Sequence, residues 1–149
     1  MNKILVFDMD GTMADLYGVD GWLDDLRAYR TRPYAEARPL VDMDELRNIL
    51  VQLQHRGYRV VITSWLAKEA SKAYDDAVRQ VKLAWLNLWR FPYDEIHLVK
   101  YGTTKADCTR RHGKEQTLFD DNEKIRKGWH LGNAVDASDM MDYLRGLIA

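Results

Sequence analysis

Short apolar runs alternate along this chain with longer segments whose apolar residues recur at helical spacing. The short runs have the length of buried strands, and the longer segments predict amphipathic helices. Strands are expected at residues 4–7, 58–62, 95–99, 116–119 and, at an edge, 132–135, with helices over 43–56, 70–88, 104–111, 123–129 and 138–148. This alternation favours right-handed crossovers and a parallel sheet. The pattern predicts an α/β fold: a three-layer α/β/α Rossmann-like domain with a mostly parallel five-stranded sheet.

The longest predicted helix carries one apolar stripe. The stripe consists of Ala70, Ala73, Tyr74, Ala77, Val78, Val81, Ala84, Trp85 and Leu88, and Phe91-Pro92 ends the helix. We expect the small residues early in this stripe to allow a close approach to the sheet.

Residues 13–40 interrupt the alternation of strands and helices. This segment is polar and carries two of the three prolines of the chain. Leu23 and Leu26 are spaced for one face of a short helix, whereas Arg32-Pro33 and Arg38-Pro39 favour extended or turn conformations. We therefore expect a single domain over residues 1–149, with a small cap-like insert at about 13–40 that lies over the end of the first strand.

Composition narrows the class of protein. Charged residues make up 30% of the 149 residues and the formal net charge is -1, which argues against a nucleic-acid coat or a membrane-surface protein. No run approaches the roughly 20 apolar residues of a membrane span, so a soluble, cytoplasmic protein is expected. Cys108 is the only cysteine, which excludes an internal disulfide and a thiolate metal cluster. The sequence does not indicate an oligomeric state.

Polar side chains stand where the predicted strands end. The first strand runs directly into Asp8 and Asp10, and Thr63, Lys100 and Asp120 stand at or just after the ends of later strands. In an open parallel sheet these ends share one edge, where ligands bind. Two carboxylates this close together at the end of a buried strand require a cation, a shared proton or exposure at a cleft.

The chemistry available at this edge is that of phosphoryl groups. Asp8, Asp10 and Asp120 form a hard oxygen site suited to Mg²⁺, and no histidine pair is placed to bind zinc. A carboxylate can also attack phosphorus and form an aspartyl phosphate. Phosphoryl oxygens then need donors and positive charge, which a threonine, a lysine and a helix N-terminus supply.

Four segments of the chain resemble, in order, the motifs of the haloacid dehalogenase-like (HAD) superfamily, which is dominated by phosphatases. They are Asp8-Met9-Asp10-Gly11-Thr12, the strand Val60-Val61-Ile62-Thr63, Lys105, and Leu118-Phe119-Asp120-Asp121-Asn122. The ordered set covers nearly the whole chain and is far more specific than its first member alone. The arrangement is similar to small nucleotidase-like members and, more loosely, to the phosphatase half of polynucleotide kinase-phosphatases.

This resemblance implies a role for each aspartate. Asp8 would attack phosphorus and bind Mg²⁺. Asp10 would protonate the leaving oxygen, then deprotonate the water that hydrolyses the intermediate, and its backbone carbonyl would bind the metal. Asp120 would complete the metal shell, and Asp121 would position a metal-bound water or tune the site.

The resemblance also implies roles for a threonine and a lysine. Thr63 would hold a phosphoryl oxygen, and Lys105 would neutralise Asp8 and the phosphoryl group. Lys100 is the other lysine near the third strand and stays an alternative, although the lysine of the family commonly begins a helix, as Lys105 does. Thr12 is expected to be a turn residue.

Several residues are candidates for contacting the rest of the substrate. Ser64 is expected to contact phosphate or substrate, and Trp65, which follows it, is placed to stack on a base. The insert supplies Arg27, Arg30, Arg32 and Arg38. Guanidinium groups suit phosphate recognition, and an ordinary solvated surface is an equally good interpretation of this cluster.

These observations lead to three hypotheses. The first is a Mg²⁺-dependent phosphomonoester hydrolase that works through an aspartyl-phosphate intermediate on a phosphorylated small molecule, most simply a nucleotide (5'-nucleotidase-like). The second is a polynucleotide 3'-phosphatase acting on nucleic-acid ends. The third is a catalytically silent binding protein on the same fold, whose expected mark, loss of Asp8, Asp10 or the acidic fourth segment, is not found.

Overall fold

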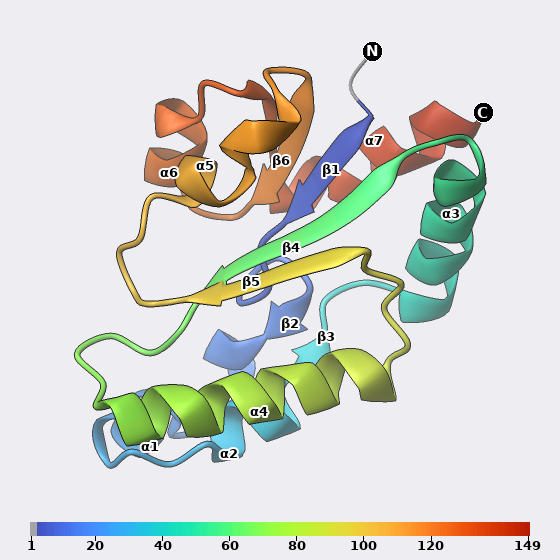
Figure 1. The fold of residues 1–149 in the computed structure, drawn as a ribbon. Coiled ribbons are helices and arrows are strands. Elements are labelled where there is room, and N and C mark those ends of the chain that lie inside the picture. The colour runs from blue at the N-terminus through green and yellow to red at the C-terminus, as the bar shows by residue number, and fades with distance from the viewer. Residues whose placement is uncertain (1–2) are drawn as a thin grey trace.

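The computed structural model describes residues 3–149, and its centre is a parallel sheet (Figure 1). Five strands lie in the order β5-β4-β1-β6-β7, and every pairing between them is parallel. Their bounds are β1 Ile4–Phe7, β4 Arg59–Trp65, β5 Glu95–Val99, β6 Gln116–Asp120 and β7 Gly132–Asp136. The predicted α/β fold is confirmed. β1 lies in the middle of the sheet, and its side chains are almost entirely buried there.

Helices cover both faces of this sheet. They are α3 Met43–His55, α4 Lys72–Leu88, α5 Lys105–Thr109, α6 Glu123–Gly128 and α7 Met140–Ile148. The larger apolar cluster joins Leu5 and Phe7 to residues of α3, α4 and α7. A smaller cluster on the other face joins Val6 to Ala106 at α5 and to Trp129 after α6. Among the described helices, none is long and apolar enough to cross a membrane.

Polar side chains cap α3, α4 and α6. The Asp42 carboxylate accepts hydrogen bonds from the first turn of α3, and Asn122 does the same for α6. Ser71 caps α4 by accepting from the Tyr74 amide. Thr104 stands at the N-cap position of α5, but its side chain makes no capping hydrogen bond.

The insert is more regular than the sequence suggested. Its two ends pair as the antiparallel strands β2 (Ala14–Asp15) and β3 (Arg38–Pro39), and between them lie the helices α1 (Trp22–Arg27) and α2 (Arg32–Glu36). The prediction of an extended or turn conformation at Arg32-Pro33 is wrong, because both residues begin α2. Proline is compatible with the first turn of a helix, where its missing N–H has no partner to lose. Figure 1 shows α1 and α2 alongside α4.

The inward face of α4 differs from the predicted stripe. Ala73, Ala77, Ala84 and Leu88 are exposed, whereas the buried residues of the helix are Tyr74, Asp75, Val78, Lys82, Trp85 and Leu86. Burial stabilises in proportion to apolar area, so the large side chains set the rotation of the helix and the alanines do not. This rotation brings Lys82 into the interior.

Candidate active site

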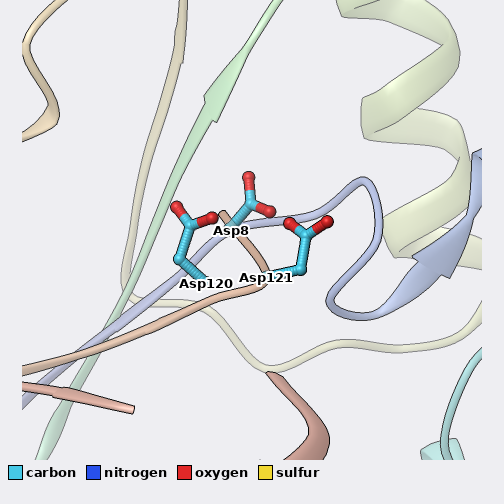
Figure 2. Close-up of side chains that lie close together, drawn as sticks. All are labelled: Asp8, Asp120 and Asp121. Atoms are coloured by element: carbon cyan, nitrogen blue, oxygen red, sulfur yellow. The ribbon is translucent and has the colours of Figure 1, made fainter. Parts of the chain in front are cut away.

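Three aspartates meet at the carboxyl edge of the sheet (Figure 2). Asp8 follows β1, and its amide donates to the Phe119 carbonyl of the neighbouring strand at 3.0 Å. Asp120 ends β6 and Asp121 comes next, so the pairing of β1 with β6 sets the three side chains together. One carboxylate oxygen of each lies within 4.8 Å of the others. Three hard oxygen donors at this separation fit the ligand preference of Mg²⁺.

The electrostatics of the cluster call for a cation. Burial raises the pKa of Asp120, and the charge of Asp8 raises it further despite Lys105. Burial and the same Asp8 charge raise the pKa of Asp121 to about 7. The carboxylates therefore repel one another in the folded protein, and a bound divalent cation would relieve that repulsion.

Lys105 is the lysine that reaches the aspartates. Its Nζ lies 2.8 Å from an oxygen of Asp8 and 2.8 Å from an oxygen of Asp120, at the first residue of α5. Burial lowers the pKa of Lys105, but the two carboxylates outweigh it and the net pKa is raised, which keeps the side chain charged. Lys100, the alternative for this role, is exposed, and its Nζ lies 3.7 Å from an oxygen of Asp75.

The two threonines predicted near the sheet edge differ in their contacts. The Thr12 hydroxyl donates to Asp8 at 3.0 Å, so Thr12 belongs to the site and is more than the turn residue expected from sequence. Thr63 is fully buried at the end of β4, and its hydroxyl has no hydrogen-bond partner within residues 3–149. A buried hydroxyl without a partner is costly in a folded protein. Thr63 is not among the residues that line the cavity described below.

Glycine is required in the turn that follows Asp10. Gly11 has a left-handed φ of +83°, and a Cβ built on it would collide with the Asp121 carboxylate. The absence of a side chain therefore lets the first and fourth segments approach each other.

Asp10 is held by a residue that the sequence did not reveal. Lys82, from α4, places its Nζ 2.8 Å from an Asp10 carboxylate oxygen, 2.9 Å from the Ser64 hydroxyl and 2.8 Å from the Trp65 carbonyl. Burial raises the pKa of Asp10, Lys82 opposes that rise, and the net pKa is raised. The one feature of the sequence that could have indicated burial of Lys82 is its position one helical turn from both Val78 and Leu86. An exposed lysine at the border of an apolar helix face has the same spacing.

A cavity of about 440 Å³ opens above these groups. Its floor contains Asp8, Asp10, Lys105, Asp120 and Asp121, and its walls combine the ends of β4 and β5 with the insert. The insert contributes Leu16, Tyr17, Trp22, Leu23, Leu26, Arg27 and Tyr34. The end of β4 contributes Ser64 and Trp65, and the segments after β4 and β5 contribute Lys68 and Tyr101.

The four arginines of the insert are not brought together at this cavity. Arg27 lines it, whereas Arg30 and Arg32 pair with the Asp25 carboxylate and Arg38 is exposed on β3. Of the proposed arginine contacts, only Arg27 therefore stands where a ligand in the cavity would meet it.

Trp65 is fixed as one wall of the cavity. Strand β4 continues three residues beyond its predicted end at 62, so Trp65 is part of the sheet. Its indole N–H donates to the Thr103 carbonyl at 2.7 Å, and its ring centre lies 4.8 Å from that of Tyr101. The two rings form an aromatic surface beside Lys105.

The fold has counterparts among solved structures. D,D-heptose 1,7-bisphosphate phosphatase from Burkholderia thailandensis aligns with a TM-score of 0.50 at 16% identity, over 85% of this chain and 70% of that one. The fold is shared with phosphatases. The B. bronchiseptica D,D-heptose 1,7-bisphosphate phosphatase, complexed with magnesium and phosphate, aligns with a TM-score of 0.54 at 13% identity, over 90% and 78% of the two chains.

A third structure is the N-terminal part of a Bacteroides fragilis protein, which contains a phosphatase domain complexed with Mg. It aligns with a TM-score of 0.53 at 17% identity, over 97% of this chain and 39% of that one. No family model and no curated protein matches the sequence. At these identities the likeness concerns the fold, and the function of this chain is argued from its own residues.

Proposed function

We propose that this protein is a Mg²⁺-dependent phosphomonoester hydrolase of the HAD superfamily. The observation that carries the proposal is the charge arrangement at the sheet edge: three aspartates within 4.8 Å of one another, with a buried lysine bonded to two of them. The fold shared with magnesium-bound phosphatase structures supports the same conclusion.

Asp8 is proposed as the nucleophile. An oxygen of its carboxylate attacks the phosphorus atom, the bond from phosphorus to the leaving oxygen breaks, and an aspartyl phosphate forms. Asp8, Asp120, Asp121 and the Asp10 carbonyl would hold Mg²⁺, which when bound supplies positive charge for the phosphoryl oxygens. Lys105 pairs with the Asp8 carboxylate and adds positive charge of its own.

Asp10 is proposed as the acid and then the base. Its raised pKa favours the protonated form that donates to the leaving oxygen. In the second step Asp10 takes a proton from the water that attacks the aspartyl phosphate, which returns Asp8 as a carboxylate and releases phosphate. Thr63 would donate its free hydroxyl to a phosphoryl oxygen.

A nucleotide is proposed as the substrate. The cavity of about 440 Å³ suits a small molecule, and Trp65, Tyr101 and Trp22 provide aromatic surfaces for a base. Arg27 and Lys68 supply positive charge at the rim, while Ser64 is held near the floor. The B. thailandensis structure is that of a heptose bisphosphate phosphatase, so sugar phosphates are the first compounds to compare with nucleotides.

Phosphate release from a panel of phosphomonoesters tests the proposal. The panel contains nucleoside 5'-monophosphates, heptose and hexose phosphates, and oligonucleotides with a 3'-phosphate, each with MgCl₂ and with EDTA. We expect Mg²⁺-dependent release that is fastest with a mononucleotide. Turnover restricted to the 3'-phosphorylated oligonucleotide would favour the polynucleotide 3'-phosphatase, whose substrate end would enter the same cavity.

Asp8→Asn is the decisive variant. Because an amide neither attacks phosphorus nor ligates Mg²⁺ as a carboxylate does, we expect turnover to fall by at least about 10³-fold with the fold retained. Circular dichroism and phosphate release measure the two properties. Unchanged turnover would contradict the covalent mechanism, and no turnover in the unaltered protein with any phosphomonoester would favour the silent binding protein.

A further inference from the structure

Lys82 is a buried cation outside the four segments that resemble the HAD motifs. Its residue is 1% exposed, and it reaches the site from the middle of α4, a helix otherwise packed through Tyr74, Val78 and Trp85. Burying an ammonium group costs several kcal/mol unless it is fully paired. A lysine at this position therefore has to be explained by what it bonds.

All three N–H groups of Lys82 have acceptors. They are the Asp10 carboxylate, the Ser64 hydroxyl and the Trp65 carbonyl, at 2.8 to 2.9 Å. The Tyr34 ring of the insert covers the ammonium with its centre 5.2 Å from Nζ. An ammonium carries only three donors, so none is left for a substrate, and Lys82 acts through its neighbours.

The contact fixes one oxygen of Asp10 and leaves the other available. Lys82 bonds to Oδ2, and within residues 3–149 no hydrogen bond to Oδ1 is formed. The Asp10 side chain is 16% exposed and lines the cavity. One carboxylate oxygen is thus anchored to α4 and to the end of β4, while the group as a whole still faces the cavity.

We infer that Lys82 is a positioning residue that orients the Asp10 carboxyl for proton transfer. This inference rests on the proposed function, because it assumes that Asp10 is the acid and base. When Asp8 bonds to phosphorus and the leaving oxygen departs, that oxygen receives a proton from Asp10. The anchor holds the donor in reach, and Tyr34 makes the insert part of the same support.

The dependence of rate on the leaving group separates positioning from a general structural role. An alcohol leaving group needs the proton from Asp10, whereas a dinitrophenolate leaves without one. The value of kcat/KM reports on steps up to formation of the aspartyl phosphate, and so isolates the acid step. The two substrates are 2,4-dinitrophenyl phosphate and the alcohol phosphomonoester that the unaltered protein hydrolyses fastest.

For Lys82→Met we expect kcat/KM for the alcohol ester to fall by about 10²-fold and that for dinitrophenyl phosphate to fall by less than about 5-fold. In an Asp10→Asn background the same change should add less than about 3-fold, because the residue it acts through is already gone. Lys72→Met makes the same chemical change at an exposed position of α4 and should leave both values unchanged.

Lys82→Gln provides a second variant should the methionine variant fail to fold, since its uncharged amide keeps two N–H donors in the polar surroundings of Lys82. The same split between substrates is expected, with a smaller loss. An equal loss for both substrates, or a full additional loss in the Asp10→Asn background, would overturn the inference while leaving the proposed function intact. Absence of turnover in the unaltered protein would instead refute the proposed function, and the inference with it.

Discussion

Two groups of charged side chains in this molecule are built in opposite ways. At the sheet edge three aspartates share Lys105, and the pKa of Asp121 is raised to about 7 by burial and by the charge of Asp8. At Glu95, on the edge strand β5, one carboxylate meets four basic side chains. These are Arg59, His97, Arg111 and His112.

The pKa values report the difference. Burial raises the pKa of Glu95, but hydrogen bonds from His97, His112 and Arg59 outweigh it and lower the pKa to about 2. Glu95 therefore stabilises the fold, whereas the aspartates carry more negative charge than their surroundings balance. Such an imbalance costs stability and is typical of sites that bind a cation or react.

Gly11→Ala should have the largest effect on the aspartate cluster. The left-handed backbone costs about 1 kcal/mol for alanine, and the collision of the new Cβ with Asp121 raises the total to about 3 kcal/mol. Displacing Asp121 should also lower Mg²⁺-dependent turnover by about 10²-fold. Urea unfolding and phosphate release measure these effects.

Gly102→Ala is the matched control for that change. Gly102 has a φ of +89°, but nothing lies within 4 Å of a Cβ built on it. The control should lose about 1 kcal/mol and keep its turnover. Equal losses in the two variants would show that the approach of Gly11 to Asp121 is unimportant.

Glu95→Gln should destabilise the protein by about 1 kcal/mol near neutral pH, because the amide loses charge-assisted bonds to partly exposed partners. The folded pKa of about 2 lies below the ordinary value of 4.5. The contribution of Glu95 is therefore complete above about pH 4.5 and is lost as the pH falls toward 2. Urea unfolding at several pH values should show the two proteins converging in acid.

The control for Glu95 is Glu123→Gln, which removes an exposed carboxylate paired with Lys127 within one helix. We expect it to cost less than about 0.5 kcal/mol. If Glu95→Gln is no more destabilising than this control at any pH, the four basic neighbours do not stabilise the fold as proposed.

Asp121→Asn should have the smallest effect and the opposite sign. Removing a carboxylate from the crowded cluster should stabilise the protein by about 0.5 kcal/mol in EDTA, a modest value because Asp121 is only partly buried. The stabilisation that MgCl₂ gives the unaltered protein should shrink in this variant. Thermal unfolding with EDTA and with MgCl₂ measures both effects.

The control is Asp139→Asn, at an exposed residue before α7 and outside the site. It should leave the melting temperature unchanged both in EDTA and in MgCl₂. A lower melting temperature of Asp121→Asn in EDTA would contradict the account of the cluster as underpaired.

The sequence predicted the positions of the strands well because each contains a short group of apolar residues, the clearest being Ile4 to Phe7. Asp8, Thr63 and Asp120 follow such groups in β1, β4 and β6. Parallel topology alone then gathered these polar side chains at one edge, and the order of β1 beside β6 explains why Asp8 and Asp120 lie so close. The roles proposed for these residues stay predictions, to be tested by the variants above.

The hydrophobic pattern of the sequence predicted neither the burial of Lys82 nor the ion pairs of the insert. The rotation of α4 depends on which side chains bury the most area against the sheet and insert. Tyr74, Val78 and Trp85 of the predicted stripe are buried, but its alanines within the helix are exposed and Lys82 is buried in their place. The pairing of Arg30 and Arg32 with Asp25 likewise depends on how α1 and α2 pack. The rotation of α4 and the ion pairs of Asp25 both depend on how separate segments pack together, which the spacing of apolar residues within one segment does not predict.

The short pairing of β2 with β3 has a consequence for how such a protein can change. Ala14 lies opposite Pro39, so the insert leaves and rejoins the domain at a single point. A loop anchored in this way can be lengthened or replaced at a small entropic cost, since loop-closure entropy grows slowly with length. The part of the cavity wall that the insert forms can therefore change in length and sequence while Asp8, Lys105 and Asp120 keep their distances from one another.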